Sequence, residues 1–353
     1  MNLLFKYLVL LVLFPFTSCL RHTGDSEKGL VMEIKDIESN KLDVSDFVDM
    51  IEIYQLETDS FLVGEIGDLC VYDSILFAID KLTFNLFSYN LRTKTLLSCV
   101  NKKGNGPYEY IKPQALSVDG NCLYLLDSYS QKIICYNHKL ESCNEIRLSF
   151  TAFDFFKVNG GFLLCSTLPD PSLEYKKIVF TDEDGNIKNT FIHTHQYGMT
   201  VGKNFIQQSE DSVFVTIPYS NQIYRWNGNM LYGLYYTDFG HLNIPEDMRM
   251  KDLSFYDDDY IHNNNFFVTN SFFINAFPYE NKMHYHIQEK VTGNSYCGIM
   301  RDEKNGLPFF PRWQYKDYLI GVCRLEELTE VSKKQIGEVE DGLAVLFFKV
   351  KEL

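Results

Sequence analysis

The pattern of apolar and polar positions along most of the chain predicts short β-strands separated by turns. Residues 123–126 form an apolar run that ends at Asp127-Ser128, and residues 132–136 form a second run that ends at Asn137. Short runs of β-branched and aromatic residues, bounded by Asp, Asn, Gly and Ser, are typical of strands rather than helices. We therefore expect an all-β fold.

This pattern repeats at a spacing of 47 residues, because residues 71–90 align without a gap with residues 118–137. Asp80 falls on Asp127, and capping of a recurring turn explains that match without catalysis. Fainter copies continue downstream, and the unit is close to one four-stranded propeller blade. The sequence predicts a six-bladed β-propeller of four-stranded antiparallel blades over residues 46–353.

The two ends of this region suit closure of the ring. A propeller is closed when strands from both termini share one blade, which removes open sheet edges. Residues 49–55 and 343–350 have the required strand patterns. Before the last strand, residues 325–336 have apolar positions near helical spacing, so we expect a short helix inserted between strands.

The first residues predict export. One cation, Lys6, precedes the apolar run 7–16, and small residues follow it. That order is typical of a signal peptide, here residues 1–18. The run is far shorter than the ~20 residues that a membrane-spanning helix needs.

The cysteine after this segment suggests a lipid anchor. Cys19 follows Phe16-Thr17-Ser18 and resembles the acylated cysteine of a bacterial lipobox, although Phe16 stands where leucine is usual. An ordinary secretory signal with an incidental cysteine is the alternative. The resemblance implies a lipid on Cys19, a tether over residues 19–45, and attachment to a membrane of the Gram-negative cell envelope, on the periplasmic or surface side.

The charge and the cysteine pattern argue against several classes of function. The net charge of −14 argues against nucleic acid as a partner, because an acidic domain repels phosphate backbones. Nine cysteines occur without a CxxC motif, so neither a zinc ribbon nor a thioredoxin-like motif is indicated. Apart from Cys19 we expect mostly free, buried thiols, and pairing of Cys143 with Cys122 or Cys135 stays open.

The segment GNGPYEY, residues 104–110, joins the two clearest repeats. Gly104 and Gly106 lie on either side of a single residue, and Pro107 follows them. Two glycines so close together allow a tight connection with positive φ angles. No GK[ST] follows, so this is not a phosphate-binding loop. We expect Gly104, Gly106, Pro107 and Glu109 to be structural residues of the loop.

This element and the repeats after it resemble the six-bladed β-propeller lipoproteins of Gram-negative gut-type bacteria, which are related in architecture to NHL-repeat propellers. Residues 53–58, 238–246 and 342–350 are similar to the family's N-terminal, mid-chain and terminal elements. Tyr108 stands where the family usually has glycine. The resemblance covers nearly all of the chain after the signal segment, and it implies the fold but no established activity.

Several polar clusters could carry chemistry. His193 with His195, and His284 with His286, each place two imidazoles on one strand face, which is half of a metal site. The spacing identifies no further ligand, so surface histidines are the favoured interpretation. Residues 257–265 lack the DxDxDG register of a calcium loop. Since GxSxG and HExxH are also absent, we assign no catalytic residue, metal or cofactor.

Two hypotheses remain. The favoured one is an exported, membrane-anchored and monomeric binding or scaffold module for an unidentified peptide, glycan or protein partner. The alternative is a metal-dependent lyase or hydrolase with its site in the central channel of the propeller. An enzyme should hold stoichiometric metal, or show His and Asp side chains converging at one mouth of the channel.

Loops at the mouths of a propeller are the expected binding region. Long polar insertions occur at residues 169–175, 241–265 and 302–313. The last ends in Arg312-Trp313, two residue types favoured at binding hot spots. We therefore predict binding through Arg312 and Trp313, with the alternative that Trp313 opens the next strand and packs in its blade.

Overall fold

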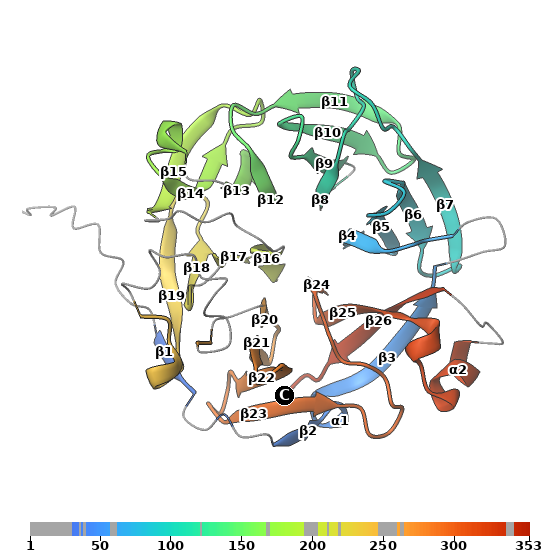
Figure 1. The fold of residues 1–353 in the computed structure, drawn as a ribbon, viewed down its shortest axis with the longest axis vertical. Helices are drawn as coiled ribbons and strands as arrows, with labels where there is room; N and C mark the ends of the chain where they lie inside the picture. The colour runs from blue at the N-terminus through green and yellow to red at the C-terminus, as the bar shows by residue number, and fades with distance from the viewer. Residues whose placement is uncertain are drawn as a thin grey trace, which may run out of the picture.

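The structure is a computed structural model in which six β-sheets surround a central axis (Figure 1). It describes residues 30–34, 37, 40–56, 62–120, 122–166, 170–193, 204–209, 212–217, 220–245, 260–261, 265–336 and 342–353. The predicted signal peptide and Cys19 lie outside these residues. Among the described helices, none is both long and apolar enough to cross a membrane.

Each sheet contains one blade of four antiparallel strands, which confirms the predicted six-bladed propeller, and in blades 4 and 5 an N-terminal strand adds a fifth. From the centre outward, blades 1 and 2 contain β4 (Ile66–Tyr72), β5 (Ile75–Asp80), β6 (Leu86–Asn90), β7 (Thr95–Val100), β8 (Pro113–Asp119), β9 (Cys122–Asp127), β10 (Lys132–Asn137) and β11 (Ser142–Arg147). Blades 3 and 4 contain β12 (Ala152–Val158), β13 (Gly161–Ser166), β14 (Lys176–Thr181), β15 (Ile187–His193), β16 (Ile206–Ser209), β17 (Ser212–Val215), β18 (Gln222–Trp226) and β19 (Leu231–Asp238). Blades 5 and 6 contain β20 (Asn265–Val268), β21 (Phe272–Tyr279), β22 (Lys282–Glu289), β23 (Ser295–Arg301), β24 (Trp313–Tyr315), β25 (Tyr318–Arg324), β26 (Leu343–Val350) and β3 (Val48–Gln55).

Blade 6 closes the ring with strands from both ends of the chain, as the sequence predicts. β3 pairs antiparallel with β26, with Tyr54 opposite Val345 and Ile51 opposite Phe348. Between β25 and β26 the chain forms a 3-10 turn, Leu325–Glu327, and the helix α2 (Glu330–Ile336). The short helix expected in this insertion is therefore present.

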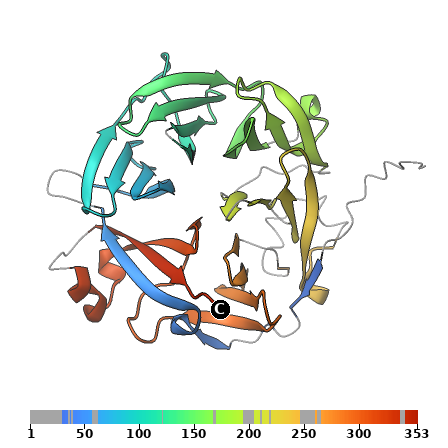
Figure 2. The same cartoon turned by 180° about the vertical axis from the view of Figure 1, so that it is seen from behind.

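Two further strands lie in the segment expected to be a tether. β1 (Leu30–Glu33) pairs parallel with β19, and β2 (Lys41–Asp43) pairs parallel with β23. A short helix, α1 (Val44–Phe47), then leads into β3. The N-terminal segment thus follows the outer strands of blades 4, 5 and 6 in turn (Figure 2). The packed part of the chain begins by residue 30, before the boundary at 46 expected from the sequence.

A glycine in blade 5 makes room for this N-terminal segment. A β-carbon at Gly298 would lie 2.3 Å from the carbonyl oxygen of Asn40. The same oxygen accepts a hydrogen bond from the backbone N–H of Ile299 at 2.7 Å. Any larger residue at 298 would push the segment away from the blade.

The hydrophobic core consists of clusters between neighbouring blades. Phe77, Tyr110, Tyr136 and their neighbours fill the space between blades 1 and 2, for example. The abundance of Phe and Tyr is thus largely explained by packing between sheets. All eight cysteines in the described part of the chain are free, but Cys99 and Cys143 are exposed, so the expectation of burial holds only for some of them.

Candidate functional site

The connectivity of the blades places the longest connections at one end of the propeller. In every blade the innermost strand starts at the end where the second strand stops, because neighbouring strands are antiparallel. The opposite end carries tight turns, such as the one between Tyr72 and Ile75. We call the first end the long-loop face. It carries the connections that contain residues 104–110, 169–175, 241–265 and 302–313.

The three insertions predicted to bind a ligand therefore emerge at one face, together with the GNGPYEY loop. Residues 169, 246–259 and 262–264 lie outside the described residues, which includes most of the polar run considered for calcium. Of that run, Asn265 donates from Nδ2 to the carbonyl oxygen of Pro311 at 3.4 Å. Connections from blades 4 and 5 thus meet beside the start of blade 6.

Exposed apolar side chains occur on several connections of the long-loop face. Tyr129 is 72% exposed, Leu82 65%, Phe310 59%, Tyr175 48% and Tyr108 39%. A single exposed apolar residue is ordinary on a protein surface. Five of them on connections at the same end of a rigid scaffold are a suitable arrangement for contact with a partner, because loops on such scaffolds commonly carry binding residues.

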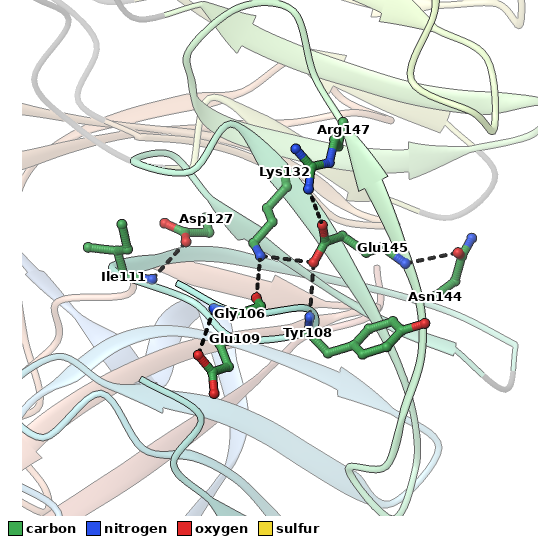
Figure 3. A network of polar contacts seen from close by, with 9 residues as sticks. All are labelled: Gly106, Tyr108, Glu109, Ile111, Asp127, Lys132, Asn144, Glu145 and Arg147. Carbon is green, nitrogen blue, oxygen red and sulfur yellow. Dashed lines mark hydrogen bonds and ion pairs between the residues drawn. The ribbon is translucent and has the colours of Figure 1, made fainter. Parts of the chain in front are cut away.

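The GNGPYEY loop is shaped by a side chain rather than by glycine φ angles (Figure 3). The expectation of positive φ at Gly104 and Gly106 does not hold, whereas Tyr108 has φ 60°. Oε2 of Glu109 accepts the N–H of Gly106 at 2.7 Å. A β-carbon at Gly104 would lie 2.0 Å from that oxygen, and one at Gly106 would lie 3.0 Å from it. Close approach of Glu109 is therefore the reason for both glycines.

An ion pair holds the loop on blade 2. Nζ of Lys132 lies 2.9 Å from Oε2 of Glu145 and donates to the carbonyl oxygen of Gly106 at 3.4 Å. The N–H of Tyr108 donates to the same Oε2 at 3.0 Å. Burial alone would raise the pKa of Glu145, but these donors bring it below its ordinary value. The Tyr108 ring points away from the ion pair on a fixed backbone (Figure 3).

Arg312 and Trp313 have different roles. Trp313 is the first residue of β24 and is buried between blades 1 and 6, so it packs in its blade, as the alternative interpretation states. The exposed guanidinium of Arg312 lies 5.0 Å from the centre of the Trp313 ring. The side chain of Asn204 donates to the carbonyl oxygen of Arg312. Only Arg312 of this pair is available at the surface.

A buried carboxylate that the sequence did not reveal, Asp68, binds Trp313 from the innermost strand of blade 1. Oδ1 of Asp68 accepts from Nε1 of Trp313 at 2.7 Å, and Oδ2 accepts from the N–H of Leu116 at 2.6 Å. Asp68 follows an irregularity in the innermost strand of blade 1. This side chain therefore connects blade 1 to blades 2 and 6.

Asp154 has the same position in blade 3, after a similar irregularity in β12. Its Oδ2 accepts from the N–H groups of Phe205 at 2.6 Å and Ile206 at 3.2 Å, which connects blades 3 and 4. Burial, followed by repulsion from Asp68, raises the pKa of Asp154 to about 7. Both aspartates lie in innermost strands that are buried along most of their length, and nothing in their local sequence separates them from surface aspartates.

The aspartates of the 47-residue repeat are turn caps, as predicted. Asp80 accepts from the N–H of Leu82 at 2.9 Å and from the hydroxyl of Thr83 at 2.7 Å. Asp127 accepts from the N–H of Ile111 at 2.8 Å (Figure 3). Asp80 also accepts from the N–H of Gly64 at 3.2 Å, so each buried carboxylate fixes the connection that enters its blade.

The histidine pair of blade 5 is buried, so the surface interpretation is wrong for it. His284 and His286 lie on β22, and neither His284 Nε2 nor His286 Nδ1 has a hydrogen-bond partner among the described residues. Burial lowers the pKa of His286 to about 4. His193 ends β15, and His195 lies outside the described residues. The described chain contains no group of three or more His, Cys, Asp or Glu side chains arranged to hold a metal ion.

The sequence model of one protein family matches residues 31–352, which is nearly the whole propeller. The chain belongs to this family, which is described as a domain of unknown function, DUF4934. None of the curated proteins matches the chain in sequence.

Two crystal structures of Bacteroides proteins share the fold. A Bacteroides fragilis NCTC 9343 protein that was predicted to be exported is 19% identical, with a TM-score of 0.76 over 91% of this chain and 100% of its own. A member of the DUF4221 family from Bacteroides vulgatus ATCC 8482 is 8% identical, with a TM-score of 0.53 over 86% of this chain and 97% of its own. At such identities the comparison establishes the fold alone.

Proposed function

We propose that this DUF4934 protein is an exported binding or scaffold module, anchored to a membrane through a lipid on Cys19. Its long-loop face holds a protein, peptide or glycan partner. The observation that carries the proposal is the set of exposed apolar side chains on that face, at Leu82, Tyr108, Tyr129, Tyr175 and Phe310. The connections of Leu82, Tyr108 and Tyr129 are fixed by the Asp80 and Asp127 caps and the Lys132–Glu145 ion pair, so little conformational entropy would be lost there on binding.

Two observations support export. The first residues have the charge and hydrophobicity order of a signal peptide that ends before Cys19. The structurally similar Bacteroides fragilis protein was also predicted to be exported. A lipid on Cys19 would place the propeller next to the membrane, because β1 already packs on blade 4 by Leu30.

The second candidate function is an enzyme with its active site in the central channel of the propeller, and one observation favours it. Asp154 has a pKa raised to about 7 and lies in an innermost strand, so it could exchange a proton near neutral pH. Against this role, Asp68 and Asp154 each accept two or more hydrogen bonds from the protein itself. Those bonds hold the blades together, which favours a structural role for both carboxylates.

The binding proposal is tested by capture of partners from native membranes. We expect Tyr129→Ala, Tyr175→Ala and Phe310→Ala, combined in one variant, to lose partners that the unaltered protein retains.

The matched control changes Met230 and Val291 to alanine, because both are exposed on turns at the opposite face. This variant should capture the same partners as the unaltered protein. Equal capture by the long-loop variant, or equal loss in the control, would contradict a binding surface on the long-loop face.

A further inference from the structure

A pocket of about 500 Å³ lies beside the outer strands where blades 4 and 5 meet. This volume is within the ~300–1,000 Å³ that is usual for sites of small ligands and side chains. Its lining combines two carboxylates, two aromatic rings and aliphatic side chains: Glu33, Asp238, Phe239, Tyr279, Ile34, Ile37 and Leu242, with Gly240 and His241. Since Asp238 ends β19 and Tyr279 ends β21, the pocket opens at the long-loop end of these blades.

The N-terminal strand completes this pocket. Parallel pairing of β1 with β19 sets Glu33 beside Asp238, and the N–H of Ile34 donates to the carbonyl oxygen of Asp238 at 2.9 Å. Without β1 the pocket would lose one carboxylate and part of its aliphatic wall. The segment expected to be only a tether therefore supplies binding groups.

Asp238 is held in a fixed orientation. Its Oδ1 accepts from the N–H of Gly240 at 2.8 Å and from Nδ2 of Asn243 at 2.5 Å. Oδ1 of Asn243 in turn accepts from the N–H of Phe239 at 3.0 Å. No described residue donates to Oδ2 of Asp238, so one oxygen of this oriented carboxylate remains able to accept from a ligand.

The aromatic wall is backed by a buried polar side chain, His284. The rings of Tyr279 and His284 meet edge to face with centres 5.7 Å apart, and His284 is 1% exposed, with no partner for Nε2 in the described part of the chain. Unpaired buried polar groups cost about 1–3 kcal/mol each, and native proteins keep few of them. Since burial lowers the pKa of His284, a neutral ring rather than a cation lies behind Tyr279.

These groups together define the ligand. Two adjacent carboxylates favour a cation, and the partly exposed ring of Tyr279 favours one that is planar and can stack. The aliphatic side chains of Ile34, Ile37 and Leu242 suit the methylene groups of a long side chain. We propose that the pocket binds an arginine side chain of the partner. The inference rests on the proposed function for that partner, and the net charge of −14 favours approach of a basic surface.

A small probe tests the pocket independently of any partner. The full-length protein is titrated calorimetrically with N-acetyl-arginine methylamide, and with its neutral isostere N-acetyl-citrulline methylamide. We expect saturable binding of the arginine probe, weakened by salt, and at least about tenfold weaker binding of the citrulline probe. Glu33→Gln and Tyr279→Ala should each weaken the arginine probe several-fold, whereas Glu303→Gln, an exposed acid outside the pocket, should not.

Equal affinity for the two probes, or unchanged affinity in Glu33→Gln, would overturn the arginine pocket. Binding of calcium ions without any effect of the arginine probe would also overturn it, in favour of a cation site. Partner capture separates this inference from the proposed function. If the long-loop variant loses partners but the unaltered protein does not bind the arginine probe, the pocket alone is refuted. If the protein binds the probe but captures no partner, the proposed function alone is refuted.

Discussion

Replacement of Trp313 by phenylalanine should show how much the hydrogen bond between Trp313 and Asp68 contributes to the stability of the propeller. The change keeps an aromatic side chain in the core between blades 1 and 6 but removes the Nε1–H group. That group donates to Oδ1 of Asp68 at 2.7 Å across 245 positions of sequence. The carboxylate would keep its bond from Leu116 but lose the hydrogen bond that joins it to Trp313 of blade 6.

The expected cost has two parts. A hydrogen bond to a buried charged group contributes about 1.5–3 kcal/mol. The smaller ring also buries roughly 40 Å² less apolar surface, which is about 1 kcal/mol at 25 cal/mol per Å². We therefore expect Trp313→Phe to lower the free energy of unfolding by about 2.5–4 kcal/mol, measured by urea denaturation followed by circular dichroism.

The second tryptophan provides the control. Trp226 is equally buried, and its ring packs on Phe180 and Phe191 without a side-chain hydrogen bond to any described residue. Trp226→Phe should cost only the packing part, about 1 kcal/mol. A double-mutant cycle with Asp68→Ala should give a coupling energy of about 1.5–3 kcal/mol between Asp68 and Trp313. Equal costs for the two Trp→Phe variants, or a coupling near zero, would refute the reasoning.

Three more outcomes are expected. Gly104→Ala should destabilise the protein by about 1–2 kcal/mol, because the new β-carbon would force Glu109 to release the N–H of Gly106. In a Glu109→Ala background this loss of stability should largely disappear. An equal loss in both backgrounds would argue against a steric conflict between residue 104 and Glu109. The pKa of Asp154 is raised in the folded state, so folding takes up a proton, and stability should fall as pH rises from about 4 to about 7. Asp154→Asn should flatten that dependence in denaturation curves across this range, and parallel profiles for both proteins would disprove the assignment. Cys19→Ser should leave an unprocessed or soluble protein, and fractionation with membranes as before would rule out the lipid anchor.

The sequence alone determined the propeller because the signals of its blades are local. Short apolar runs, and turn residues such as Asp80 and Asp127, act within one blade and recur at a fixed spacing. Closure was also predictable, since β3 and β26 have strand patterns at the two ends of the repeat region. The long insertions were visible as breaks in the same periodicity.

The functional surfaces depended on tertiary structure, because their residues meet only when the ring is closed. The sequence around Trp313 is compatible with a surface binding residue or with a core residue, and its hydrogen bond to buried Asp68 shows that it belongs to the core. Glu33 lies in a segment whose sequence is typical of a tether, and only parallel pairing with β19 brings it beside Asp238. Strand pairing and packing between distant blades decide these contacts, and no local pattern of residues encodes them.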